Sequence, residues 1–190
     1  DVERLRESLS DCLEESERVL SMLKIMMSVA EAESGTMLLK LQECDLAKTL
    51  SQIVALYEYV AEEKNITISL GAAICIAIQV DQTRISQVWA NLIDNGIKYG
   101  REGGWLRIDA KKSGEEVVVT FEDNGIGISE SEQGRIWERL YRGDRSRSQQ
   151  GLGLGLNYVQ AVVAAHGGSV SVSSRLHRGS RFEVRLPLAS

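Results

Sequence analysis

Residues 91–99 read Asn-Leu-Ile-Asp-Asn-Gly-Ile-Lys-Tyr, and this stretch decides the fold. Asn91, Asn95 and Lys98 are three and four residues apart, so in a helix they share one face. Amide oxygens beside a fixed positive charge suit a hard cation that carries phosphates. Taken alone, a solvated outer face would explain the stretch equally well. A different face of the same helix is apolar, with Ile85, Val88, Trp89, Leu92 and Ile93.

Two glycine motifs downstream favour the phosphate interpretation. Residues 117–122 are β-branched and partly alternating, which predicts a strand that runs into Asp123-Asn-Gly-Ile-Gly-Ile128. This places a carboxylate and bare main chain at the end of a strand. Residues 151–156 read Gly-Leu-Gly-Leu-Gly-Leu and lead into a helical pattern. Glycine-rich main chain that opens a helix can bind an anion, because the first-turn amides lack partners and the helix dipole favours negative charge.

Two common nucleotide motifs are absent from the sequence. Nowhere does Gly-x-x-x-x-Gly-Lys-Ser/Thr occur, which excludes a P-loop. Gly151 and Gly153 are followed by Leu156 where a dinucleotide fingerprint needs its third glycine. They also follow a polar stretch instead of a strand, which argues against a Rossmann site.

The order of the motifs resembles the catalytic, ATP-binding domain of a bacterial sensor histidine kinase. That domain belongs to the ATPase superfamily shared with gyrase, the mismatch-repair ATPase and a heat-shock chaperone. The resemblance extends from about residue 1 to the end, and it implies a two-layer α/β sandwich of the Bergerat type, preceded by a long coiled-coil-like helix. The matching segments are an asparagine box (91–99), two glycine boxes (123–128 and 151–156), an aromatic box (136–148) and closing strands (166–174 and 179–187).

The resemblance also implies roles for individual residues. Asp123 would accept a hydrogen bond from the adenine amino group, although a turn-forming Asp before Gly is the simpler alternative. Asn95 would be the Mg²⁺ ligand with Asn91 beside it, and Lys98 would lie against phosphate oxygens. The remaining cofactor-binding residues implied are Tyr99, Gly125, Gly127, Gly151, Gly153, Leu154 and Gly155.

Between the two glycine boxes lies the stretch that closes over ATP in the resembling family. It contains Arg135, Arg139, Arg142, Arg145 and Arg147, and we interpret residues 142–150 as a mobile loop. Arg142 is the predicted catalytic arginine, alongside Asn91, Asn95 and Lys98. At least three of the five arginines are equally well explained as solvated loop charges.

The first 35 residues form a separate unit. Apolar residues recur alternately every three and four positions from Val2 to Ala30, which predicts a helix of about 34 residues that needs partner helices. By resemblance, 1–35 is the second helix of the dimerisation and phosphoacceptor hairpin, and 36–190 is the catalytic ATP-binding domain. The only histidines, His166 and His177, lack a phosphoacceptor context, so we expect the phosphorylated histidine on a preceding helix.

The remaining pattern predicts one mixed sheet with helices on one face. Three departures from the family are Gly96 in place of Ala, and Trp137 and Leu140 in place of phenylalanines. Expected strands cover 37–42, 65–70, 73–80, 105–112, 115–123 and two closing segments, and expected helices cover 45–57, 81–99, 131–140 and 152–165.

Composition excludes several classes of protein. A net charge of −5 argues against a broad nucleic-acid surface, and no apolar run approaches the roughly 20 residues of a membrane span. Cys12, Cys44 and Cys75 are far apart, and we interpret them as buried thiols in a reducing compartment.

The chain begins at Asp1, inside a periodic helix, so we expect a piece of a longer protein. We expect this piece to be cytoplasmic and without membrane contact, whether or not its parent is anchored in the bacterial inner membrane.

Three functional hypotheses follow. The first is an ATP-dependent protein-histidine kinase that dimerises through its N-terminal helix and passes the phosphoryl group to a response regulator receiver domain; this piece alone would bind Mg-ATP without labelling itself. The second is a degenerate kinase, a nucleotide-binding regulatory module without transfer. The third is an ATP-driven clamp, which by resemblance would need a water-activating glutamate where Asn91 stands.

Overall fold

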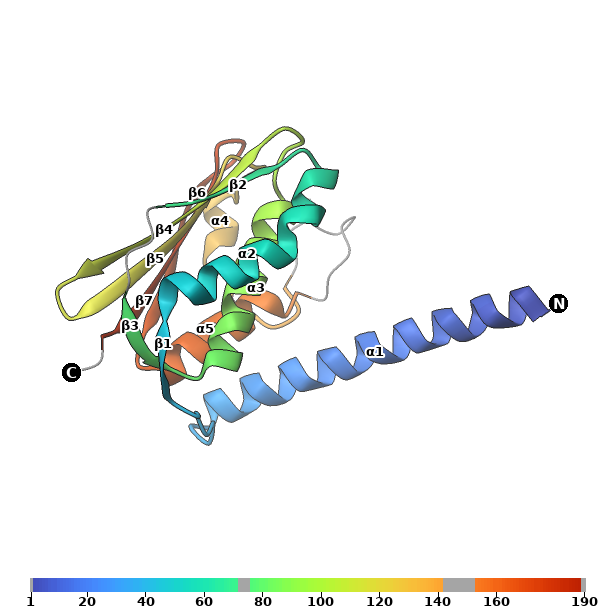
Figure 1. The fold of residues 1–190 in the computed structure, drawn as a ribbon, viewed down its shortest axis with the longest axis horizontal. Helices are drawn as coiled ribbons and strands as arrows, with labels where there is room; N and C mark the ends of the chain where they lie inside the picture. Colours follow the sequence, from blue (N-terminus) through green and yellow to red (C-terminus); the bar gives the residue numbers. More distant parts are fainter. Residues whose placement is uncertain (1, 72–75, 142–152, 189–190) are drawn as a thin grey trace.

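A computed structural model describes residues 2–71, 76–141 and 153–188 of the chain. Its body is a five-stranded sheet with three helices packed on one face (Figure 1). β2 and β4 are parallel and the other neighbours are antiparallel, so the sheet is mixed, as predicted. The covering helices are α2 (Leu46–Glu63), α3 (Gln82–Lys98) and α5 (Gly155–Ala165). In spatial order the strands are β2 (Thr67–Leu70), β4 (Trp105–Ser113), β5 (Glu116–Asp123), β7 (Gly179–Pro187) and β6 (Ser169–Arg175).

A second, two-stranded sheet corrects the expectation of a single sheet. β1 (Gln42–Asp45) pairs antiparallel with β3 (Ala77–Val80). The strand predicted over 37–42 is wrong, because β3 ends where α3 begins and leaves no strand for 37–41 to pair with. Instead, the Lys40 N–H donates to Asp81 Oδ2 at 3.1 Å. Part of the strand predicted over 73–80 lies outside the described residues.

The helix that carries the asparagine box is fixed at both ends. Asp81 caps its N-terminus, where Oδ1 accepts a hydrogen bond from the Arg84 N–H at 3.1 Å. Near its C-terminus, Lys64 Nζ donates to the carbonyls of Ile97 at 3.3 Å and Lys98 at 3.4 Å. In between, Trp89 is fully buried and stacks on a β5 phenylalanine with ring centroids 5.6 Å apart. The apolar face predicted from the sequence therefore holds α3 against the sheet.

Gly96 shows why this helix departs from the family pattern. A Cβ at Gly96 would lie 2.8 Å from Leu106 Cδ1, so the glycine lets α3 approach β4 closely. The glycine reduces helix propensity by up to about 1 kcal/mol relative to Ala.

α1 (Val2–Glu33) is a single long helix whose N-terminal part extends away from the body (Figure 1). Its last turns contact the body, where Val29 is 1% exposed, and Glu31 pairs with Arg84 at 3.3 Å. Most of its apolar stripe is solvent-exposed, including Leu5, Leu9 and Leu13.

The two cysteines in the described residues differ in exposure, because one lies in the body and the other on the exposed part of α1. Cys44 is buried as predicted, whereas Cys12 on α1 is exposed, so that prediction is wrong. The reason is that nothing else in the described chain covers this part of α1. Cys75 lies outside the described residues.

The segment before the second glycine box is less helical than predicted. α4 (Glu130–Gln133) replaces the helix expected over 131–140, and turns follow it to Leu140, which has a positive φ of 59°. α5 begins at Gly155, while residues 142–152 lie outside the described residues. Across the part of the chain that the structure describes, no helix is long and apolar enough to cross a membrane.

Candidate functional site

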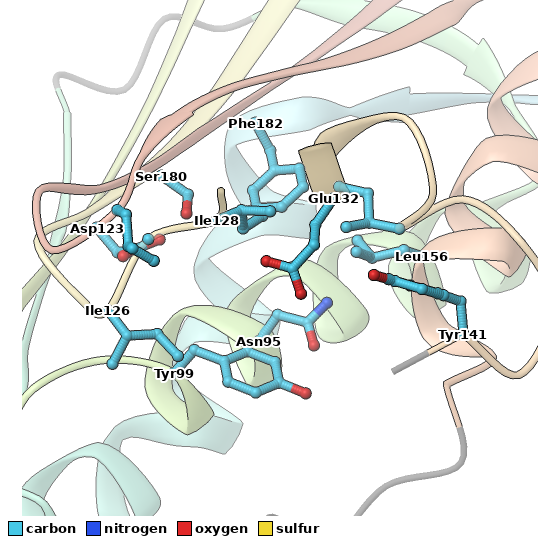
Figure 2. Close-up of a pocket in the computed structure, with 13 residues that line it drawn as sticks. Asn95, Tyr99, Asp123, Ile126, Ile128, Glu132, Tyr141, Leu156, Ser180 and Phe182 are labelled. Carbon is cyan, nitrogen blue, oxygen red and sulfur yellow. The ribbon is translucent and has the colours of Figure 1, made fainter. Parts of the chain in front are cut away.

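An apolar pocket and a polar hollow meet at the C-terminal end of α3. They share Asn95, Tyr99, Ile136, Tyr141 and Leu156, so they form one continuous depression. The apolar pocket also contains Asp123, Ile126, Gly127, Ile128, Glu132, Leu176, Ser180 and Phe182 (Figure 2). The polar hollow also contains Glu14, Arg18, Ile25, Asn91, Asp94, Lys98, Gly153, Leu154 and Gly155.

Asp123 supplies the charged group of the apolar pocket. It is the last residue of β5, it is 8% exposed, and its Oδ1 accepts a hydrogen bond from the Gly125 N–H at 2.8 Å. Burial raises the pKa of Asp123 to about 6, although the main-chain N–H groups of Gly125 and Ser180 oppose the rise. A carboxylate among apolar side chains, with one oxygen engaged by Gly125, is suited to accept a hydrogen bond from a ligand donor.

The two glycines of the first glycine box are required by the packing of the loop itself. A Cβ at Gly125 would lie 2.2 Å from the Tyr99 carbonyl oxygen, and the Ile126 N–H donates to that same oxygen at 3.0 Å. Gly127 has a φ of +68°, and a Cβ there would lie 2.1 Å from the Arg175 carbonyl oxygen. The loop is therefore held between the end of α3 and the β6–β7 turn, which fixes the floor of the pocket. Gly127 lines the pocket, whereas Gly125 lines neither cavity.

The asparagine face predicted from the sequence lines the polar hollow. Asn91, Asn95 and Lys98 all border it, together with Gly153 and Gly155 of the second glycine box. A Cβ at Gly155 would lie 3.3 Å from Asn91 Oδ1, so the two boxes are packed directly on each other. Asn91 Nδ2 is buried and has no hydrogen-bond partner among the described residues. A buried amide beside glycine main chain at an open hollow fits a polar, phosphate-bearing ligand with a hard cation.

Lys98 adds a positive charge to the polar hollow, next to the shared residue Tyr99. Its Nζ lies 5.1 Å from the centroid of the Tyr99 ring, and both residues line the polar hollow. Leu154, a predicted cofactor-binding residue, also lines the hollow and directly precedes the first residue of α5. Arg142 and Gly151, the other two predicted site residues, lie outside the described residues.

Several pocket residues were missed by sequence reasoning. Ser180 and Phe182 alternate along β7 and point toward the pocket, and Glu132 of α4 reaches into it (Figure 2). The alternation in β7 could have identified the first two, because residues two apart share a face of a strand. Glu132 carried no such signal, since its position depends on how α4 packs.

Comparisons with known proteins agree with this geometry. Residues 80–190 match the family described as histidine kinase-, DNA gyrase B- and HSP90-like ATPase. The chain is 31% identical to the alginate biosynthesis sensor protein KinB of Pseudomonas aeruginosa, over 92% of this chain and 29% of that protein. It is 30% identical to the sensor-like histidine kinase SenX3 of Mycobacterium tuberculosis, over 98% of this chain and 46% of that protein. The chain therefore spans from under a third to about half of the length of these relatives.

Two solved structures show the same fold. Full-length ShkA in complex with AMPPNP superposes with a TM-score of 0.85 at 27% identity, over 97% of this chain and 39% of that one. Histidine kinase ThkA in complex with the response regulator TrrA gives a TM-score of 0.68 at 22% identity, over 90% of this chain and 49% of that one.

Proposed function

Because this chain belongs to the family of histidine kinase-, DNA gyrase B- and HSP90-like ATPases, we propose that it binds Mg-ATP and transfers the γ-phosphoryl group to a histidine of a helix outside residues 1–190. Its relatives include a sensor-like histidine kinase and a second sensor protein, which supports an ATP-dependent kinase function. One observation carries the proposal: the buried carboxylate of Asp123 lines an apolar pocket that is continuous with the polar hollow, which is lined by asparagines and glycines.

The apolar pocket would hold the purine. Ile126, Ile128 and Phe182 would offer apolar contact, and Asp123 would accept a hydrogen bond from the adenine amino group. Guanine presents a carbonyl oxygen at that position, which would leave the carboxylate without a donor. A buried, unpaired polar group costs about 1–3 kcal/mol, so the pocket should prefer adenine.

The polar hollow would hold the phosphates and the metal. Asn95 and Asn91 would contribute amide oxygens to Mg²⁺, Lys98 would neutralise phosphate oxygens, and Gly153, Leu154 and Gly155 would offer main-chain amides at the start of α5. When bound, Mg²⁺ neutralises charge on the phosphates and orients them. Tyr99 would flank the phosphates at the junction, and Arg142 remains the predicted arginine for the transferred group.

The site supports transfer to a protein better than hydrolysis. Asn91 occupies the position at which an ATP-driven clamp would need a water-activating glutamate. An amide cannot serve as a general base in its place. The acceptor histidine would lie on another helix, because neither His166 nor His177 has the sequence context of a phosphoacceptor. His166 is 8% exposed, its Nε2 accepts from the Asp81 N–H at 3.0 Å, and its Nδ1 lies 2.8 Å from the Val162 carbonyl oxygen. His177 lies in the β6–β7 turn with a φ of 63°.

α1 would pair with other helices in the longer protein. Its exposed stripe of leucines and valines suits a helical bundle, which supports a homodimer formed through this helix. The phosphoryl group would then pass to a response regulator receiver domain, the class of partner present in the ThkA complex. A degenerate kinase that binds nucleotide without transfer is the remaining alternative, and only a transfer assay separates the two.

The test combines binding with transfer. Isothermal titration of this chain should show binding of Mg-ATP, weaker binding of ATP in EDTA, and little binding of Mg-GTP. When the chain is extended by a helix that carries a histidine phosphoacceptor, radiolabel from [γ-³²P]ATP should appear in acid-labile form, whereas the unextended chain should stay unlabelled. Absence of ATP binding would refute the whole proposal, and binding without transfer would leave the regulatory module.

A further inference from the structure

α1 forms one wall of the polar hollow. Glu14 and Arg18 lie in the same cavity as Asn91, Lys98 and Gly155, although the sequence predicts that α1 belongs to a separate unit. Figure 1 shows the helix running past the end of the body where α5 begins, so the hollow lies between α1 and the body. A ligand in the hollow would therefore have α1 on the side opposite the body.

Arg18 is free to turn toward such a ligand. Its ion pair is with Glu15 at 3.5 Å, three residues earlier on the same helix, and the two side chains are 47% and 66% exposed. Ion pairs this exposed contribute little to stability, so leaving Glu15 costs almost nothing. The guanidinium can also donate two parallel hydrogen bonds to a phosphate, which a lysine cannot do.

The charges around the hollow explain why Arg18 matters. Mg-ATP carries a net charge of about −2. Among the described residues that line the polar hollow, Lys98 is the cation that the body contributes. Arg18 is the cation that α1 contributes, while Glu14 and Asp94 add negative charge. Without Arg18, the described side chains around the hollow would therefore repel a phosphate tail on balance.

We propose that Arg18 binds the terminal phosphate of ATP, so that α1 completes the nucleotide site. This inference rests on the proposed function, because it requires the purine in the apolar pocket and the phosphates in the polar hollow. With the base beside Asp123, the phosphate chain would run toward α1, and the terminal phosphate would lie nearest this helix. Arg18 then distinguishes ATP from ADP, whereas Lys98, which lies beside the shared residue Tyr99, contacts both.

The experiment measures the dissociation constants of Mg-ATP and Mg-ADP by calorimetry on the 190-residue chain. Arg18→Gln should weaken Mg-ATP binding by roughly five- to tenfold and leave Mg-ADP binding unchanged. Arg18→Lys should keep part of the ATP preference. Glu14→Gln should shift Mg-ATP binding in the opposite direction, toward higher affinity, because it removes a carboxylate from the same wall.

Arg6→Gln is the matched control, since Arg6 is an exposed arginine on the same helix that does not line the hollow. It should change neither constant. Equal affinity of Arg18→Gln and wild type for Mg-ATP would overturn the inference, and so would an equal loss of ATP and ADP binding. If wild type itself binds no Mg-ATP, the proposed function fails instead, and the two failures are thereby distinguished.

Discussion

Replacing Asp123 by Asn should stabilise the nucleotide-free protein while it damages binding. Asp123 is 8% exposed, and burial raises its pKa to about 6 from an ordinary value of 3.8. The folded protein therefore holds the proton more tightly than the unfolded chain does. It follows that the ionised carboxyl opposes folding above pH 6, and that this penalty disappears as the pH falls toward 4.

The magnitude follows from the same pKa. At 1.36 kcal/mol for each pH unit, the difference between 3.8 and about 6 corresponds to about 3 kcal/mol near pH 8. Asn is neutral at every pH, and its side-chain oxygen can still accept the hydrogen bond from the Gly125 N–H, which is 2.8 Å long in the wild type. We expect Asp123→Asn to raise the free energy of unfolding by about 1–3 kcal/mol at pH 8 and by only about 0.5 kcal/mol at pH 4.

Binding should change in the opposite direction. With its oxygen engaged by Gly125, the Asn side chain would turn its NH₂ group toward the adenine amino group, and two donors would face each other. A buried, unpaired donor costs about 1–3 kcal/mol, so Mg-ATP should bind roughly 10- to 100-fold more weakly. Guanine offers an acceptor at this position, so the preference for ATP over GTP should shrink.

Urea unfolding between pH 4 and pH 8, paired with calorimetry at pH 7.5, measures both effects. Asp109→Asn is the control, because Asp109 is exposed on β4 and lines neither cavity. The gap in unfolding free energy between Asp123→Asn and wild type should widen with pH. A gap that is flat over this range, or a variant less stable than wild type at pH 8, would refute the link between burial and the raised pKa.

Three further predictions concern residues around the site: a glycine of the pocket loop, an ion pair between α1 and α3, and a buried histidine. Gly127→Ala should lower the melting temperature by several degrees and weaken ATP binding, because Gly127 has a φ of +68° and a Cβ there would meet the Arg175 carbonyl oxygen. Gly134→Ala is the control and should do neither, since no atom lies within 4 Å of a Cβ at Gly134. A double-mutant cycle on the Arg84–Glu31 ion pair should give a coupling of about 0.5–1 kcal/mol that falls in high salt. His166→Gln should lessen the loss of stability on acidification below pH 6.5, since burial lowers the pKa of His166 and its protonation opposes folding; an unchanged acid limb in urea titrations would contradict this.

Local sequence patterns were enough to predict the asparagine face and the helix that carries it. Asn91, Asn95 and Lys98 share a face because their spacing matches one helical period, and Asp81 is an N-cap by its own chemistry. The strand that ends at Asp123 was equally local, since the β-branched run from Val117 to Thr120 favours a strand by itself. These features needed no knowledge of the distant chain.

Features that depend on distant partners could not be predicted in this way. Residues 37–41 are apolar enough for a strand, yet they form none because β3 gives way to α3 opposite them. Cys12 looks like a buried thiol in the periodic pattern, but its helix has no covering element among the described residues. Glu132 enters the apolar pocket only because of how α4 is placed. In each case the outcome is set by contacts that the local sequence does not encode.

The position of α1 ties nucleotide binding to the geometry of the N-terminal helix. α1 contacts the body through its last turns, where Val29 is buried and Glu33 accepts a hydrogen bond from Arg139 Nε at 3.2 Å. Arg18 lies eleven residues before Val29, or roughly 16 Å along the helix axis. A tilt of about 10° at this anchor would move Arg18 by roughly 3 Å, which is the length of a hydrogen bond. If Arg18 binds the terminal phosphate, a small reorientation of the helix is therefore enough to make or break the contact, and ATP affinity becomes sensitive to whatever holds the far end of α1.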